Sequence, residues 1–215
     1  GSVAKHVMNA ASENLVPCTL ELGGKSPVVI SKTADLKTTA KRIMFGKTLN
    51  AGQICLAPDY VVVHKDQKDE FIKETKNAVS EYFPNLKDNE DYTSVINEKH
   101  YDRLKDLLND AIEKGAKIDE INPANEDFSQ QEFYKMPPTI VTDTTDDMKI
   151  MQEEIFGPLL PIVEYDEIEE ATTLINSKDR PLGLYYFGTN KSEEDNLLNK
   201  TSSGGVTVNN VISHL

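Results

Sequence analysis

Short apolar runs alternate with longer segments of helical period along most of the chain, and this alternation limits the possible folds more than any other feature. "PVVI" at 27–30 and "YVVVH" at 60–64 are almost continuously apolar. A strand with one face in water would instead alternate apolar and polar residues. Strands of this kind must be covered on both faces, which requires helices between them. The pattern therefore predicts an α/β fold, a mostly parallel layered sheet flanked by helices.

Two of the expected helices have recognisable ends. Asp35 is a candidate N-cap for a helix from 36 to about 49, and Asn97 for a helix that runs to 114 and stops at Gly115. The residues that share the apolar face of the first helix are Leu36, Ala40, Ile43, Met44 and Lys47. Further expected helices are 67–82, 168–177 and 193–201, further strands are 116–121, 137–143, 160–165, 182–189 and 204–210, and 122–135 is expected to be a surface loop.

Composition excludes several classes of function. The 215 residues include 36 acidic and 23 basic side chains, for a net charge of −13. Such a surface repels phosphate backbones and anionic lipids, so neither nucleic acid nor a membrane is an expected partner. Two cysteines and four scattered histidines provide neither a disulfide framework nor a zinc site, and they fit a reducing, cytoplasmic compartment. We expect no metal.

Cys55 is the first candidate for chemistry. It lies in "GQICLAP" (52–58), between a predicted helix and a predicted strand, with Gly52 and Pro58 marking a loop. A free cysteine often only fills a core. A cysteine in a loop on an α/β scaffold, however, is accessible to a substrate and can act as a nucleophile once it is a thiolate. No histidine lies near it in sequence, so a Cys–His pair is not indicated.

Glu21 is the second candidate, in "LELGGKSPVVI" (20–30). A carboxylate between two leucines is either an exposed strand-end residue or a partly buried group that can serve as a general base. The glycine pair that follows allows close approach of the backbone to a ligand. Neither the Walker pattern nor the GxGxxG fingerprint occurs in the chain.

A third stretch, "MQEEIFGPLLPI" (151–162), places two carboxylates and an aromatic residue before a predicted strand. It can be a turn with solvated acids. Alternatively, one of the two carboxylates accepts hydrogen bonds from sugar hydroxyls while Phe156 stacks on a flat ligand.

In combination, these stretches resemble the aldehyde dehydrogenase family. "LELGGKSP" is similar to its glutamate signature, "GQICLAP" to its cysteine signature and "EEIFGP" to its cofactor-contact motif, in the family's order and spacing. "APDY" and "TSSGGVTVNNVISH" are similar to the class 3 branch, and "FPNLKDNEDYTSVIN" and "MPPTIVTD" to bacterial coniferyl aldehyde dehydrogenases.

The resemblance implies a mechanism and a set of roles. Cys55 attacks an aldehyde, a hydride passes to NAD or NADP, and Glu21 activates the water that hydrolyses the resulting thioester. Glu154 and Phe156 contact the nicotinamide riboside, and Ile54 and Leu56 line the aldehyde pocket. The aldehyde is aromatic, such as coniferyl aldehyde, or aliphatic. Cys18 matches no role in the family, and we expect it to pack in the core.

The resemblance also implies how the chain is divided. Residues 1–22 are expected to be the end of a dinucleotide-binding domain or a seam segment, and 23–215 the catalytic domain. The family's N-terminal cofactor domain and C-terminal tail are not in the sequence. We therefore expect the chain alone to be almost inactive and the full-length protein to be a homodimer.

Two other functions are compatible with the same residues. A thiol esterase would use Cys55 and Glu21 without a cofactor, and a non-catalytic interaction domain would keep the fold without using the site.

Overall fold

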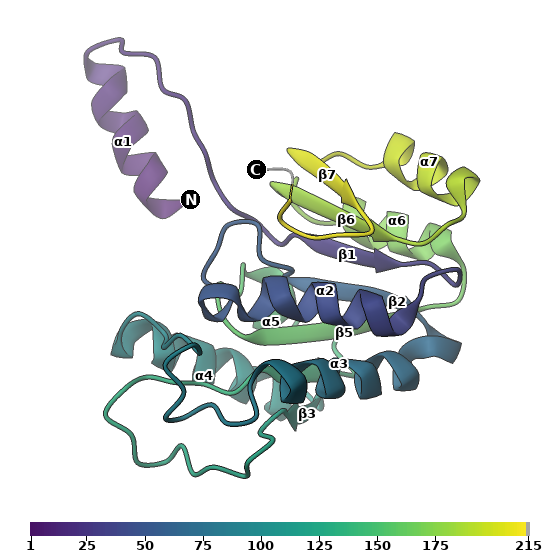
Figure 1. Ribbon diagram of the computed structural model, residues 1–215. Coiled ribbons are helices and arrows are strands. Elements are labelled where there is room, and N and C mark those ends of the chain that lie inside the picture. Colours follow the sequence, from purple (N-terminus) through teal and green to yellow (C-terminus); the bar gives the residue numbers. More distant parts are fainter. Residues whose placement is uncertain (214–215) are drawn as a thin grey trace.

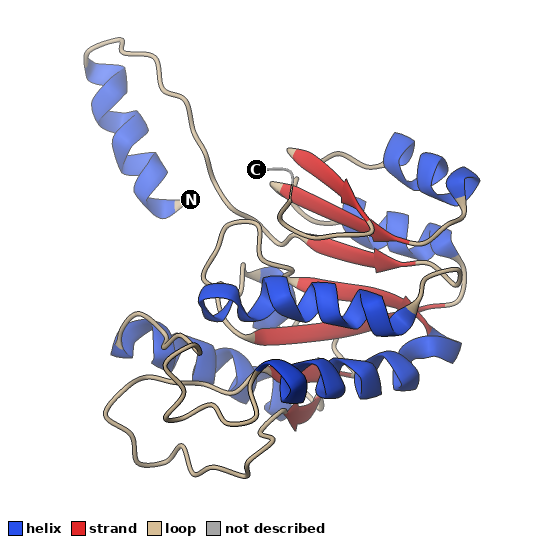
Figure 2. Cartoon of the chain, in the orientation of Figure 1, coloured by secondary structure: helices blue, strands red, loops and turns tan. Residues whose placement is uncertain are grey.

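A computed structural model describes residues 1–213 and shows one seven-stranded sheet with helices on both faces (Figures 1 and 2). The strand order is β3-β4-β5-β2-β1-β6-β7. All neighbouring strands are parallel except the edge pair β3–β4, which is antiparallel. The strands are β1 (Pro27–Ile30), β2 (Tyr60–His64), β3 (Lys117–Glu120), β4 (Thr139–Thr142), β5 (Leu159–Tyr165), β6 (Gly183–Phe187) and β7 (Gly205–Val208). The predicted α/β fold is confirmed.

The helices connect these strands. They are α1 (Ser2–Glu13), α2 (Leu36–Thr48), α3 (Lys68–Tyr82), α4 (Glu98–Glu113), α5 (Lys149–Gln152), α6 (Ile168–Asn176) and α7 (Lys191–Lys200), with short 3-10 turns η1 (Leu49–Gly52) and η2 (Lys65–Gln67). The predicted caps are confirmed, since Asp35 accepts from the Thr38 N–H and Asn97 from the His100 N–H. No helix among residues 1–213 is long and apolar enough to cross a membrane.

Alternate residues of each central strand enter opposite halves of the core. Val28 and Ile30 of β1 pack with α2 and α3, whereas Val29 between them packs with residues of α4, α6 and α7. Figure 1 shows α2 and α3 on the same side of the sheet. Because both faces are covered, the strands need no polar face, which explains their continuous apolar runs.

Several elements differ from the sequence prediction, and three of the differences concern helices. Helix α1 was not expected, and Figure 1 shows it apart from the sheet. Helix α7 begins at Lys191 rather than 193, because Asn190 caps it by accepting from the Glu193 N–H. The helix expected to reach 49 ends at Thr48, because Asn50 and Ala51 have left-handed φ values of 51° and 52°.

Candidate functional site

The three sequence motifs meet at one edge of the sheet. "LELGGKSP" leads into β1, "GQICLAP" into β2 and "EEIFGP" into β5. These three strands are adjacent and parallel, with Pro27 beside Tyr60 and Val61 beside Ile162. Segments that precede neighbouring parallel strands must emerge at the same edge. The topology therefore places the motifs together at the amino-terminal edge of the strands.

A buried ion pair joins the glutamate motif and the "EEIFGP" motif to Asp59, the residue that follows "GQICLAP". The Lys25 ammonium bonds the Asp59 carboxylate, and their side chains are only 7% and 4% exposed. Lys25 also donates to the carbonyls of Ile150 (2.7 Å) and Glu153 (2.9 Å). The second oxygen of Asp59 accepts from the Ile155 N–H at 2.8 Å. Each charge thus has several partners, as a buried charge requires.

Residues 49–58, which we call the Cys55 loop, run from the end of α2 to β2. The Cys55 side chain is exposed, so its sulfur is accessible as expected. Gly52 has a φ of +72°, and a Cβ there would overlap the carbonyl of Gly157 in the "EEIFGP" motif. After Cys55, the Leu56 carbonyl accepts from the Tyr185 hydroxyl of β6 at 2.6 Å. Within residues 1–213, the Cys55 N–H donates to no acceptor.

Glu154 and Phe156 lie in the segment that precedes β5. The Glu154 carboxylate lies against Gly23, where a Cβ would overlap it. Burial raises the pKa of Glu154, and a hydrogen bond from the Gly24 N–H opposes that rise. Arg103 of α4 donates to the carbonyls of Glu154 and Ile155 and so fixes the backbone beneath them. Phe156 has a left-handed φ of 48° and its side chain is partly exposed, so its ring is accessible from solvent.

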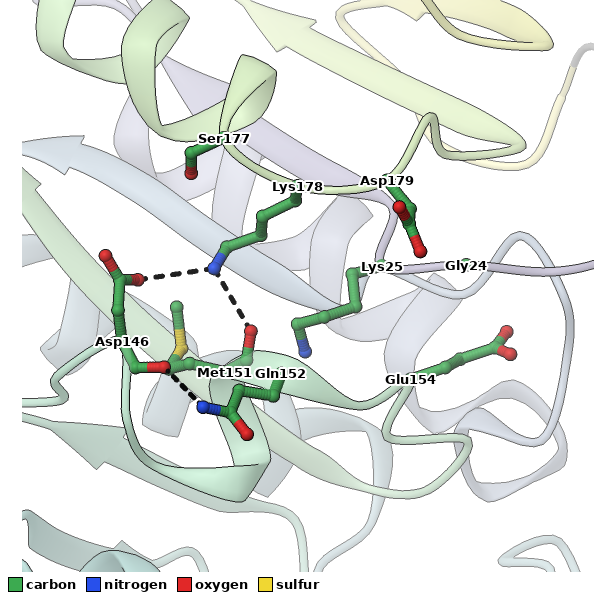
Figure 3. A pocket seen from close by; sticks show the side chains of 9 residues that line it. All are labelled: Gly24, Lys25, Asp146, Met151, Gln152, Glu154, Ser177, Lys178 and Asp179. Atoms are coloured by element: carbon green, nitrogen blue, oxygen red, sulfur yellow. Dashed lines mark hydrogen bonds and ion pairs between the residues drawn. The ribbon is translucent and has the colours of Figure 1, made fainter.

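A hollow of about 540 Å³ opens beside Glu154 (Figure 3). Glu154 lies at one end of it, below Gly24, and Asp146 lies at the other end. The Lys178 ammonium reaches from its loop to Asp146 (3.3 Å) and to the Met151 carbonyl (3.1 Å). The lining offers carboxylate acceptors and ammonium donors, which suits a ligand rich in hydroxyl groups.

Glu21, unlike Cys55 and Glu154, lies in a segment that few contacts hold in place. It lies in the connector, residues 14–22, every residue of which is exposed. Within residues 1–213 its carboxylate makes no hydrogen bond or ion pair. Of the two alternatives for Glu21, the structure shows the exposed residue, because nothing among residues 1–213 covers the connector. Cys18 is also exposed in the connector, so the expectation that it packs in the core is wrong.

The two pocket candidates beside the sulfur differ in burial. Ile54 is half-buried, whereas Leu56 is 2% exposed and its Cδ2 lies near Gly183. Leu56 therefore supports the Cys55 loop from below. An apolar hollow lined by Phe45, Leu49 and Tyr82 also borders the loop at Asn50.

Sequence reasoning missed the residues that support the site, chiefly Lys25, Asp59, Gln53 and Tyr185. Each looks like an ordinary polar or strand residue until its partner from another part of the chain is known. The available signals were the positions of Lys25 inside the glutamate motif, of Gln53 inside the cysteine motif and of Asp59 inside "APDY".

Comparisons with known proteins agree with the motifs. Residues 1–214 match the aldehyde dehydrogenase family. The "Probable coniferyl aldehyde dehydrogenase" of Caulobacter vibrioides is 61% identical over 214 residues, which are 100% of this chain and 44% of that protein. The substrate-bound AldH of Staphylococcus aureus is 41% identical with a TM-score of 0.90, over 99% of this chain and 45% of that one. Betaine aldehyde dehydrogenase of Staphylococcus aureus, in complex with NAD+, is 27% identical with a TM-score of 0.85, over 97% of this chain and 42% of that one.

Proposed function

Because the chain belongs to the aldehyde dehydrogenase family, we propose that it is the catalytic part of an enzyme that oxidises an aldehyde to a carboxylic acid with NAD(P)+. The observation that carries the proposal is the convergence of the three motifs, with Cys55 exposed in a loop whose Gly52 packs against Gly157 of the segment that holds Glu154. The chain spans about 44% of the length of the curated relative from Caulobacter. Residues 1–22 are proposed to be the end of a dinucleotide-binding domain or a seam segment, and 23–215 the catalytic domain.

Cys55 is the proposed nucleophile. Its thiolate forms a bond to the aldehyde carbon, and the carbonyl oxygen becomes an oxyanion. The Cys55 N–H, which has no acceptor among residues 1–213, can donate to that oxygen. Ile54, beside the sulfur and half-buried, is placed to contact the aldehyde side chain, while Leu56 shapes the pocket from below.

The residues around Glu154 fit the nicotinamide half of a dinucleotide. A carboxylate offers about four acceptor positions, and the nearby Gly24 N–H stabilises the charged form of Glu154. Glu154 can therefore accept from ribose hydroxyls, while the accessible Phe156 ring packs against the base. When bound there, NAD(P)+ would supply the hydride acceptor that oxidation of the aldehyde requires. The nicotinamide ribose is common to NAD and NADP, so these residues do not select between the two cofactors.

Glu21 is the proposed general base of the second half-reaction. The acyl group that remains on Cys55 as a thioester is attacked by water, Glu21 accepts the proton, and the thiol and the carboxylic acid are released. Because the connector is exposed, Glu21 can act in this way only when the connector is held next to the Cys55 loop. We propose that the part of the protein outside this chain holds it there, so that the chain alone is almost inactive.

The test uses the full-length protein with coniferyl aldehyde or hexanal, and with NAD+ or NADP+. We expect NAD(P)H formation to fall roughly a thousandfold or more in Cys55→Ala. In Glu21→Gln we expect a burst of about one equivalent of NAD(P)H, followed by a stall and an acylated Cys55 visible by mass spectrometry. The matched control is Glu13→Gln. Like Glu21, Glu13 is an exposed glutamate, but it lies at the end of α1, so this variant should behave like the unmodified enzyme.

Assays of ester hydrolysis and NAD(P)H formation on the same full-length protein distinguish the rival functions. A thiol esterase would hydrolyse p-nitrophenyl acetate through Cys55 yet form no NAD(P)H from any aldehyde, and a non-catalytic domain would do neither. The class 3 resemblance further supports a homodimeric, cytoplasmic enzyme, which light scattering and cell fractionation would check.

A further inference from the structure

The backbone before Cys55 has an uncommon conformation. Asn50, Ala51 and Gly52 have consecutive φ values of 51°, 52° and 72°. The left-handed region is unfavourable for an L-residue, so the loop would relax unless neighbouring groups held it. The Tyr185 hydroxyl holds the loop after Cys55. A second contact is needed before Cys55.

Gln53 supplies that contact through its side-chain amide. The Nε2 group donates to the Asn50 carbonyl at 2.9 Å and to the Ser94 carbonyl at 3.0 Å. The Oε1 atom accepts from the Ile96 N–H at 2.9 Å. In return, the Asn50 side chain donates to the Gln53 carbonyl at 3.1 Å. One amide therefore closes the left-handed turn on itself and fastens it to the segment before α4.

The contacts of Gln53 require an amide of this length. Two of its three partners are carbonyl oxygens and the third is an N–H, so one end must donate twice and the other must accept. Glutamate at this position would direct a carboxylate oxygen at two carbonyl oxygens. Methionine has a similar length and would lose all three bonds.

We propose that Gln53 is a positioning residue that fixes the Cys55 sulfur for attack by tying the Cys55 loop to residues 94–96. The inference rests on the proposed function of Cys55. Gln53 touches no reacting atom in this scheme. It acts through the backbone of Asn50–Gly52, which sets the direction in which the chain reaches Cys55.

The test compares kcat and KM of full-length Gln53→Met with those of the unmodified enzyme. We expect kcat to fall about ten- to a hundredfold, because a misplaced nucleophile slows the chemical step. The KM for NAD(P)+ should change less than about twofold, since Glu154 and Phe156 keep their own supports.

Gln131 provides a matched control. It is half-buried like Gln53, and its amide donates to the carbonyls of Phe128 (3.2 Å) and Lys135 (2.9 Å) and to the Tyr101 hydroxyl (3.3 Å), while accepting from the Lys135 N–H at 2.7 Å. Gln131→Met removes a comparable set of bonds from a loop that does not carry the nucleophile. We expect it to lower the Tm by a similar amount and to keep kcat within about twofold.

The pH dependence of Gln53→Glu gives a readout that lost stability would not. A protonated glutamate can donate to one carbonyl and still accept from the Ile96 N–H. We therefore expect the kcat of Gln53→Glu, divided by that of the unmodified enzyme, to rise as the pH falls. The same ratio for Gln53→Met should stay flat.

The outcomes separate this inference from the proposed function. If Cys55→Ala keeps its activity, the proposed function fails, whatever Gln53 does. If Cys55→Ala is inactive but Gln53→Met keeps its kcat, or Gln131→Met loses as much, the assignment of Gln53 alone is overturned.

Discussion

The Cys55 loop and the connector lead into adjacent strands at the same sheet edge, yet the chain holds them very differently. The Cys55 loop is fixed by Gln53, Tyr185 and the neighbouring Lys25–Asp59 pair. The connector with Glu21 has every residue exposed. The nucleophile half of the proposed site is therefore organised within this chain, whereas the residues of the connector that carry the proposed base have no cover among residues 1–213.

The Lys25–Asp59 pair offers the strongest way to break the organised half. Asp59→Ala leaves the Lys25 ammonium buried without its counter-charge, which costs about 3–5 kcal/mol of the free energy of unfolding. Urea denaturation would measure the change. Asp119→Ala is the control, since its pair with Lys76 is 43% exposed on both sides and such pairs contribute at most about 1 kcal/mol. Equal losses in the two variants would show that the pair does not hold the edge together.

Lys47 sharpens the comparison through pH, because it lies buried at the end of α2 next to the Cys55 loop. Burial lowers the pKa of its ammonium to about 7 from 10.5; Asp59 opposes this shift and Lys25 adds to it. Between those values the unfolded chain binds a proton that the folded chain does not, so stability gains roughly 1.4 kcal/mol per pH unit from this group as the pH rises. Below about pH 7 the lysine is charged in both states and its burial is fully destabilising.

Lys47→Met should therefore stabilise the fold most at pH 6, and its advantage should shrink as the pH rises to 9. Urea denaturation of both proteins at each pH measures the difference, in which other titrating groups largely cancel. Lys73→Met, at an exposed position of α3, should give a difference that does not change with pH. A constant difference for Lys47→Met would mean that the buried ammonium keeps its proton throughout this range.

The sequence predicted what depends on local period and failed where distant residues meet. The continuous apolar runs predicted the buried strands, and the helical period placed even Lys47 on the inner face of α2, where it is buried. The pairing of Lys25 with Asp59 joins positions that each resemble surface residues, so no local pattern indicates it. Glu21 is exposed although two leucines flank it, because those leucines are themselves uncovered. The burial expected for Cys18 was wrong because nothing among residues 1–213 covers the connector.

Helix α1 was missed by the sequence prediction, and in the structure it also lacks the buried apolar face that most helices have. Its Val3, Val7 and Met8 are 73%, 50% and 50% exposed, so the helix buries little apolar surface against residues 1–213. Most helices in proteins derive their stability from packing of an apolar face. Because both α1 and the connector are largely exposed, packing against the sheet contributes little to the stability of residues 1–22.

The smallest expected change in the free energy of unfolding is that of a substitution in the connector. Leu15, in the connector, is 92% exposed, so Leu15→Ser should change the free energy of unfolding of the 215-residue chain by less than about 0.5 kcal/mol. Leu107→Ala, a fully buried position of α4, should cost about 2–5 kcal/mol in the same urea experiment. In the full-length protein the same Leu15→Ser should cost more, because a partner surface would then cover the connector and hold Glu21 near the Cys55 loop. An equally small effect in both proteins would show that the connector stays uncovered, and the base of the second half-reaction would then have to be a residue other than Glu21.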